Sequence, residues 1–176
     1  SGNKTEKTTT LLVKENKEAN MKVVYLTFDD GPSYNTEKVL DILKENKVKA
    51  TFFVTGNGQN YNHLITRAYN EGHTIGLHTY SHNYEYVYSS TENYFNDLNQ
   101  ISDMVYQLTG NRSTVIRFPG GSSNTVSKNY KEGIMSELSQ LVQSKGYQYY
   151  DWNVSSGDAA GHGIAAESII EQSNAG

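Results

Sequence analysis

Residues 27–33 read T-F-D-D-G-P-S and follow the apolar run Val23-Val24-Tyr25-Leu26. Two adjacent carboxylates, Asp29 and Asp30, therefore stand where a buried strand is expected to end. Neighbouring carboxylates repel each other, and each loses solvation when a site closes over it. Asp-Gly-Pro is also good turn chemistry, so an ordinary turn is the alternative interpretation. The rest of the chain has to decide between a turn and a functional site.

Composition excludes several classes of protein. The 176 residues are enough for one domain with a proper core. A net charge of −4 without a basic stripe argues against nucleic acid as a partner, because phosphates would not be neutralised. No apolar run approaches the roughly 18 residues that a membrane span needs. The chain has no cysteine, which excludes disulfides and thiolate chemistry.

The chain divides into a polar arm and one domain. Residues 1–20 are polar and lysine-rich, and we expect a linker or extended arm there. From residue 21 onward, strand-like and helix-like segments alternate, which predicts a parallel sheet, either open or rolled into a barrel. The predicted strands are 21–28, 50–54, 73–79, 114–118 and 147–152, and the predicted helices are 36–46, 63–70, 91–108, 130–144 and 165–172.

Parallel α/β folds place their working residues at the carboxyl ends of the strands. Four of the five predicted strands end in ionisable or glycine-rich sequence: D-D at 29–30, H-T-Y-S-H at 78–82, R-F-P-G-G at 117–121 and D-W-N at 151–153. A scatter of structural residues is not expected to produce this arrangement. The carboxyl-end rim of the sheet is therefore the predicted site.

His78 and His82 are the candidates for metal binding at this rim. They are four positions apart, so on a helical turn both rings would lie on one face. With one carboxylate they make a set that leaves coordination positions open for water or substrate. A hydrogen-bonded surface turn is the alternative for an isolated histidine pair. The neighbouring Asp29-Asp30 pair favours a metal site, in which one carboxylate is a ligand and the other takes a proton from water.

The motifs T-F-D-D-G-P, H-T-Y-S-H, R-F-P-G-G and D-W-N, in this order, resemble those of the polysaccharide deacetylases, carbohydrate esterase family four. That family includes chitin, acetylxylan and peptidoglycan N-acetylglucosamine deacetylases. The resemblance runs from about residue 21 to residue 160. It implies an α/β fold, a distorted (β/α) barrel commonly of seven or eight strands, with residues 21–176 as the catalytic domain.

The resemblance also implies roles for single residues. The metal ligands would be Asp30, His78 and His82. Asp29 would be the general base, Arg117 would orient it, and Asp151 would tune a partner histidine. A surface ion pair is the alternative role for Arg117.

Two further residues would contact substrate. The Gly120 N–H would bind the oxyanion, and Trp152 would wall the acetyl pocket, with simple core packing as its alternative. Many relatives carry an aromatic residue where Gly120 stands, so we expect a wider groove here. Four tyrosines flank the histidine motif and could stack on sugars or serve as filler: Tyr80, Tyr84, Tyr86 and Tyr88. His63 and His73 are predicted to be ordinary helix and strand residues.

The expected cofactor is one divalent metal, with zinc first and cobalt, nickel or iron as alternatives. The expected function is removal of N-acetyl groups from N-acetylglucosamine units of peptidoglycan or a chitin-like polysaccharide. An O-acetylxylan esterase and a carbohydrate-binding module of low activity are the alternatives. A polymeric substrate of this kind predicts a secreted or surface-anchored protein, with the membrane reached only through an upstream anchor.

Family members complete the site with a histidine in a late Leu-x-His motif, which protonates the leaving amine. This motif is missing from the sequence, and five strands are too few to close the family's barrel. We therefore expect residues 1–176 to be a C-terminally incomplete domain that lacks the last strand or strands. His162 lies in a Gly-His-Gly loop, which would position a substitute acid poorly. An open sheet edge would favour pairing with another copy or with a C-terminal piece.

Overall fold

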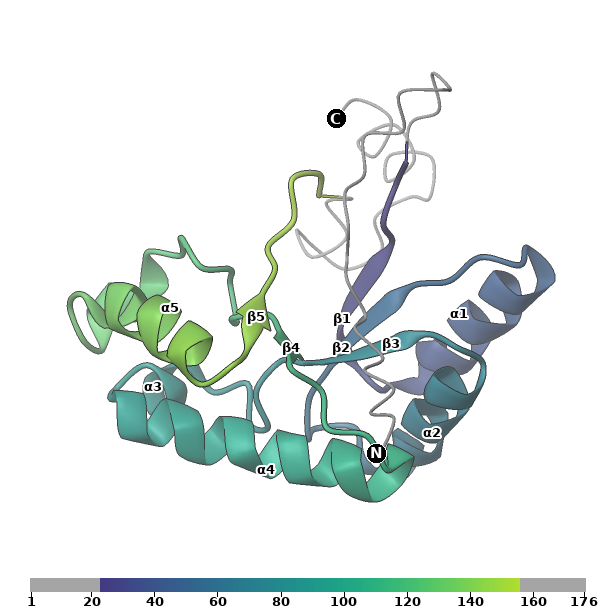
Figure 1. Ribbon diagram of the computed structural model, residues 1–176, viewed down its shortest axis with the longest axis horizontal. Helices are drawn as coiled ribbons and strands as arrows, with labels where there is room; N and C mark the ends of the chain where they lie inside the picture. The colour runs from purple at the N-terminus through teal and green to yellow at the C-terminus, as the bar shows by residue number, and fades with distance from the viewer. Residues whose placement is uncertain (1–22, 156–176) are drawn as a thin grey trace, which may run out of the picture.

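The structure is a computed structural model that describes residues 23–155 (Figure 1). Its centre is one parallel sheet with the strand order β1-β2-β3-β4-β5, so each strand lies beside the next one in the sequence. The strands are β1 (Thr27–Gly31), β2 (Thr51–Val54), β3 (Thr74–Leu77), β4 (Val115–Ile116) and β5 (Gln148–Tyr149). Among the described residues, the sheet is open and β1 and β5 are its edges.

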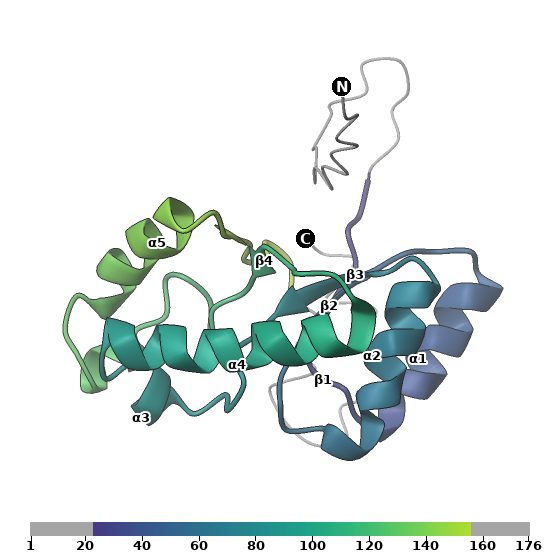
Figure 2. The same ribbon diagram turned by 60° about the horizontal axis from the view of Figure 1, so that its bottom comes forward.

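Helices connect the strands and pack along the sheet in both views (Figures 1 and 2). They are α1 (Tyr34–Glu45), α2 (Asn62–Asn70), α3 (Tyr84–Val87), α4 (Thr91–Thr109) and α5 (Ile134–Ser144). Two short 3-10 helices, η1 (Gln59–Tyr61) and η2 (Val126–Asn129), precede α2 and α5. None of the helices in residues 23–155 is both long and apolar enough to cross a membrane.

Helix α4 shows how the sequence sets the core. The Ser90 side chain accepts a hydrogen bond from the Asn93 N–H at its start, and Gly110 ends it in the left-handed region with φ 71°. Between these caps, the predicted apolar stripe is largely buried, with Leu98, Ile101 and Val105 at most 1% exposed. The helical periodicity of the sequence therefore gave the correct core face of α4.

The sheet separates a core face from a site face. In the strand register Asp29 pairs with Phe53, and Phe53 pairs with Gly76. Because successive side chains of a strand point to opposite faces, the neighbouring residues Phe52 and Ile75 enter the core instead. Asp29 thus lies on the face opposite the core.

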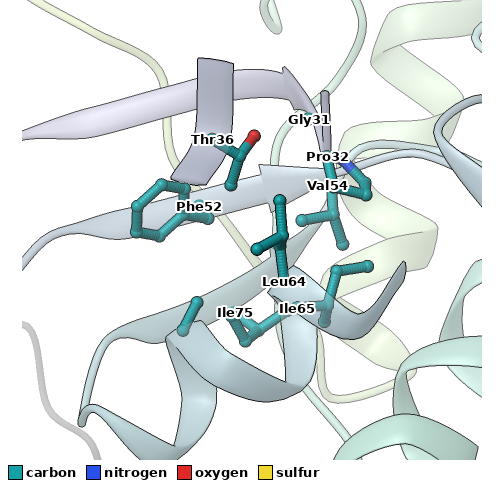
Figure 3. A pocket seen from close by; sticks show the side chains of 9 residues that line it. Gly31, Pro32, Thr36, Phe52, Val54, Leu64, Ile65 and Ile75 are labelled. Atoms are coloured by element: carbon teal, nitrogen blue, oxygen red, sulfur yellow. The ribbon is translucent and has the colours of Figure 1, made fainter. Parts of the chain in front are cut away.

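A small apolar pocket lies between β1–β3 and α2, on the core side of the sheet (Figure 3). It is lined by Gly31, Pro32, Thr36, Phe52, Val54, Leu64, Ile65, Ala68 and Ile75. None of the predicted site residues lines it. The pocket belongs to the packing behind the site and not to the site itself.

The predicted first strand is wrong at its beginning. Residues 21–28 were expected to be a buried strand, but β1 begins only at Thr27, and residues 23–26 are between 41 and 76% exposed. The neighbouring strand β2 begins at Thr51, opposite Thr27, so the apolar run has little sheet to pair with beyond the Leu26 carbonyl. The apolar composition of residues 23–26 therefore predicted a burial that these side chains do not have.

Other boundaries also differ from the prediction. The last two strands are shorter than expected, with two residues each. The helix predicted over 130–144 begins at Ile134, after Gly133 in the left-handed region with φ 75°, and η2 forms just before it. The short helix α3 was not predicted. The helix predicted over 165–172 and His162 lie outside the described residues.

Candidate active site

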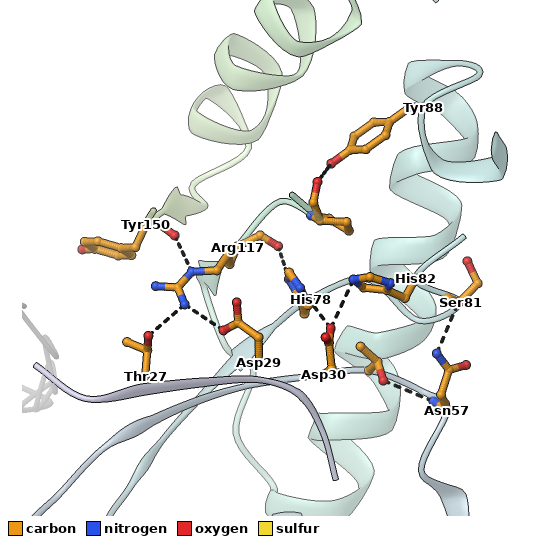
Figure 4. Close-up of polar contacts among 12 residues, drawn as sticks. Thr27, Asp29, Asp30, Asn57, His78, Ser81, His82, Tyr88, Arg117 and Tyr150 are labelled. Carbon is orange, nitrogen blue, oxygen red and sulfur yellow. Dashed lines mark hydrogen bonds and ion pairs between the residues drawn. The ribbon is translucent and has the colours of Figure 1, made fainter. Parts of the chain in front are cut away.

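Asp30, His78 and His82 come together at the carboxyl end of the sheet (Figure 4). Asp30 Oδ1 lies 3.4 Å from His78 Nε2 and 3.2 Å from His82 Nε2, and one ligand atom of each residue falls within 4.8 Å of the others. Ligand atoms about 2.0–2.1 Å from a tetrahedral zinc ion would lie roughly 3.3 Å apart. The spacing and donor types therefore fit a divalent metal.

The backbone around these ligands is unusual. Asp30 and His82 both have left-handed φ values, 65° and 51°, and so does Thr79 with 64°. Residues 78–82 do not form a helical turn, so the reason given for placing both histidines on one face was wrong. The rings nevertheless meet, with centroids 5.0 Å apart, because the left-handed residues turn the loop back on itself.

The hydrogen bonds and burial of Asp30, His78 and His82 favour the forms of these side chains that bind a cation. His78 Nδ1 lies 2.8 Å from the Arg117 carbonyl oxygen, which makes Nδ1 the donor and leaves Nε2 free to bind a metal. The hydrogen bond with His78 lowers the pKa of Asp30, although partial burial opposes this. Burial lowers the pKa of His82, which favours the neutral ring that a metal requires.

Asp29 is held by a buried guanidinium. Arg117 Nη1 donates to Asp29 Oδ1 at 2.7 Å and to Thr27 Oγ1 at 2.9 Å (Figure 4). The other nitrogens of Arg117 donate to the backbone carbonyls of Tyr150 and Asp151. The side chain of Arg117 is only 3% exposed, so the interpretation as a surface ion pair is wrong.

Two aromatic rings flank the guanidinium of Arg117. Its central carbon lies 4.1 Å from the ring centroid of Phe53 and 5.5 Å from that of Trp152. Trp152 is 45% exposed, so simple core packing does not describe it. It also packs close to Gly121. Arg117 is thereby fixed by stacking as well as by hydrogen bonds.

Asp151 is placed differently from Asp29. Its Oδ1 accepts a hydrogen bond from the Ser122 N–H at 2.9 Å, and its Oδ2 accepts one from the Ser122 hydroxyl. Among residues 23–155, this carboxylate contacts no histidine. The Asp151 carboxylate thus connects the glycine-rich turn after β4 with the end of β5 through these hydrogen bonds.

A tyrosine side chain lies beside the glycine-rich turn, where a wider groove was expected. Gly120 has φ 77°, and a Cβ atom built on it would lie 2.9 Å from the Tyr84 hydroxyl oxygen. Tyr84 also packs edge-on against His82, with ring centroids 5.6 Å apart. The half-buried phenol of Tyr84 thus fills the space beside Gly120, between the histidine loop and the glycine-rich turn.

The four tyrosines near the histidine motif have distinct positions. Tyr88 is fully buried and donates to the Pro119 carbonyl at 2.7 Å, so it cannot stack on a sugar. Tyr86 is exposed, and Tyr80 accepts a hydrogen bond from Gln59 on its hydroxyl. Tyr80 also packs on Gly56, where any side chain would collide with its ring. The aromatic spacing in the sequence could not separate these roles.

A sequence model of the polysaccharide deacetylase family matches residues 16–135. The chain belongs to the polysaccharide deacetylase family. The α/β fold class predicted from the sequence is confirmed by solved deacetylase structures. The catalytic domain of peptidoglycan N-acetylglucosamine deacetylase from Eubacterium rectale is 47% identical, with a TM-score of 0.85, over 86% of this chain and 69% of that one.

Two curated relatives of the chain extend the comparison. A Bacillus cereus peptidoglycan-N-acetylglucosamine deacetylase is 34% identical over 78% of this chain and 47% of its own length. The Bacillus subtilis peptidoglycan-N-acetylmuramic acid deacetylase PdaA is 32% identical over 88% of this chain and 57% of its own. The chain spans about half the length of the curated relatives it matches.

Proposed function

We propose that this deacetylase chain is the catalytic domain of a metal-dependent enzyme that removes acetyl groups from N-acetylglucosamine units of peptidoglycan or a chitin-like polysaccharide. The observation that carries this proposal is the division of the Asp29-Asp30 pair. Asp30 faces the two histidines, whereas Asp29 is bound by the buried Arg117. One carboxylate is thus available to a metal and the next one to a proton.

Asp30, His78 and His82 would hold the metal. When bound, a divalent cation polarises a carbonyl oxygen and lowers the pKa of water. Two imidazoles and one carboxylate suit zinc, and we propose zinc as the ion, with cobalt, nickel or iron as alternatives that the same donors accept.

The remaining residues act on the substrate. The Asp29 carboxylate takes a proton from the water molecule whose oxygen attacks the acetyl carbonyl carbon. Arg117 keeps that carboxylate in place, and the Gly120 N–H donates a hydrogen bond to the oxyanion that forms. The bond between the carbonyl carbon and nitrogen then breaks, the nitrogen takes up the proton that Asp29 had accepted from water, and acetate and a free amine leave. One oxyanion donor contributes roughly 3–4 kcal/mol of transition-state stabilisation.

A polar hollow beside the site supports a polysaccharide substrate. It is lined by Gly56, Asn57, Gly58, Gln59, Asn60, Tyr61 and Tyr80. Its loop joins the histidine loop through a bond from the Gly56 N–H to the Tyr80 carbonyl at 2.8 Å. Amide side chains and tyrosine rings are groups that bind sugar hydroxyls and sugar faces.

The proposal also covers the location of the protein, two further site residues and pairing with another chain. A peptidoglycan substrate implies secretion or a surface anchor. Trp152, which is exposed beside Arg117, is proposed to form a wall of the acetyl pocket. Asp151 is proposed to tune a histidine, as the family resemblance implies. Pairing through the edges of the open sheet stays a prediction.

Acetate release tests the function. The wild-type chain and Asp29→Asn would be incubated with zinc and with peptidoglycan, chitooligosaccharides or acetylxylan. We expect acetate from an N-acetylated substrate, released about 10²–10⁴-fold more slowly by the variant. Acetate from acetylxylan alone would support the esterase instead. Sugar binding without acetate release from any substrate would support the binding module.

A further inference from the structure

Asp97, on α4, is a buried carboxylate outside the proposed catalytic machinery. The residue is 1% exposed, and a carboxylate is rarely buried to this degree without a partner. Among residues 23–155, no lysine or arginine forms an ion pair with it. Its partners are backbone N–H groups of the loop that carries His78 and His82.

The contacts of Asp97 are specific. Oδ1 accepts a hydrogen bond from the Tyr80 N–H, and the Ser81 N–H donates to Oδ1 at 3.1 Å and to Oδ2 at 3.2 Å. On the other side of the loop, the Tyr80 and Ser81 carbonyls accept from Gly56 and Asn57. Tyr80 and Ser81 are therefore held from both sides.

The conformation of this loop needs such support. Thr79 and His82 have left-handed φ values, and non-glycine residues keep them only where the surroundings enforce them. The Tyr80 and Ser81 N–H groups lie between these two residues and belong to no helix or strand. Without Asp97, both N–H groups would have to find other acceptors in a largely buried region.

We propose that Asp97 is a positioning residue for the metal site, because its carboxylate fixes the loop that brings His82 Nε2 towards Asp30 and His78. This inference rests on the proposed metal-binding function. It does not require Asp97 to touch the metal or the substrate. The carboxylate acts only through the backbone of residues 80 and 81.

The experiment measures zinc affinity in the 176-residue chain by calorimetry with a competing chelator. Asp97→Ala removes both acceptor oxygens, whereas Asp97→Asn keeps one. Asp103→Ala is the matched control, because Asp103 lies on the same helix but pairs with Arg112 at the surface. We expect an affinity loss of about 10–100-fold for Asp97→Ala, a smaller loss for Asp97→Asn and none for the control.

A double-mutant cycle separates positioning from general destabilisation. In a His82→Ala background the ligand that Asp97 positions is gone, so Asp97→Ala should cost much less zinc affinity than in the wild type. Circular dichroism checks the fold of each variant, and Asp97→Asn carries the test if Asp97→Ala does not fold. Wild-type zinc affinity in the Asp97 variants would overturn this inference alone. A wild-type chain that binds no zinc would overturn the metal site as well.

Discussion

The guanidinium of Arg117 stacks on the ring of Phe53 because β3 has a glycine at the register position next to that ring. A Cβ atom on Gly76 would lie 2.5 Å from Phe53 Cδ1, closer than carbon atoms can approach. Asp29, Phe53 and Gly76 occupy paired register positions on β1, β2 and β3, in that order. The proposed base Asp29 therefore depends on Gly76, because the missing side chain leaves room for the Phe53 ring on which Arg117 stacks.

Gly76→Ala should push Phe53 and Arg117 away from Asp29. We expect a loss of about 1–3 kcal/mol in the free energy of unfolding, as for an overpacked core, together with reduced turnover. Urea denaturation and acetate release measure the two effects. In a Phe53→Leu background the same substitution should cost less stability. An equal cost in both backgrounds would show that the ring is not what the new methyl group meets.

Asp29→Asn and Asp30→Asn should behave differently although they are neighbours. Asp29→Asn should lower turnover by about 10²–10⁴-fold and leave zinc bound, because an amide cannot take the proton. Asp30→Asn should weaken zinc binding, because the charged ligand is lost. Zinc titration and acetate release on both variants make the comparison. Equal behaviour of the two variants would contradict the proposed division of roles.

Tyr84→Ala should open the space beside Gly120. We expect kcat/KM to fall roughly tenfold, equal to about 1.4 kcal/mol, with zinc affinity unchanged, because the residue lines the site without binding metal. Tyr84→Phe separates the hydroxyl from the ring. Tyr86→Ala, on the same short helix but exposed, is the control. If both alanine variants lose the same activity, Tyr84 has no special role beside Gly120.

His73 should make stability depend on pH. Burial lowers its pKa below 6.5, and its Nδ1 accepts the Ala50 N–H at 3.2 Å, which requires the neutral ring. The unfolded chain then binds a proton before the folded chain does. Stability should therefore fall as pH drops below about 6.5, by at most about 1.4 kcal/mol per pH unit from this group, until the lower folded pKa is reached.

Urea unfolding between pH 7.5 and 5.5 checks this dependence. His73→Phe should show a smaller slope of stability against pH than the wild type. An unchanged slope in His73→Phe would mean that His73 does not titrate differently in the folded chain.

Metal content can be measured directly. Protein purified without added metal should contain about one divalent ion by elemental analysis, and chelation should abolish turnover until the ion is returned. His82→Ala should retain much less of the ion after purification because its zinc affinity is weakened, whereas the exposed His63→Gln should keep it. Undiminished metal in His82→Ala would remove His82 from the ligand set.

The sequence predicted best those features that depend on residues close together in the chain. Hydrophobic periodicity predicted the alternating strands and helices and the apolar stripe of α4. The rule that parallel strands carry working residues at their carboxyl ends predicted the site motifs. The pairing of His78 with His82 was correct for the wrong reason, because left-handed residues and not a helical turn bring the rings together. Spacing alone does not reveal φ values.

The rest depends on tertiary contacts that have no local signal. Phe53 resembles any core residue of a strand, and Tyr84 is one of four nearby tyrosines, so neither could be identified as part of the site. Nothing in the sequence around Asp97 indicates that its carboxylate is buried. The apolar run before Thr27 predicted burial, but burial depends on a neighbour that local sequence cannot supply.

The hydrogen bonds from Arg117 to Thr27 and Asp29 require the sheet to be strongly curved. Arg117 directly follows β4, and β2 and β3 lie between β4 and β1. In a flat sheet, strands three places apart would be separated by roughly 14 Å, well beyond the reach of an arginine side chain. The guanidinium can bridge them only on the inside of a tight curve. Any change that flattens the sheet would pull the base and its anchor apart, even if every residue of the site were intact.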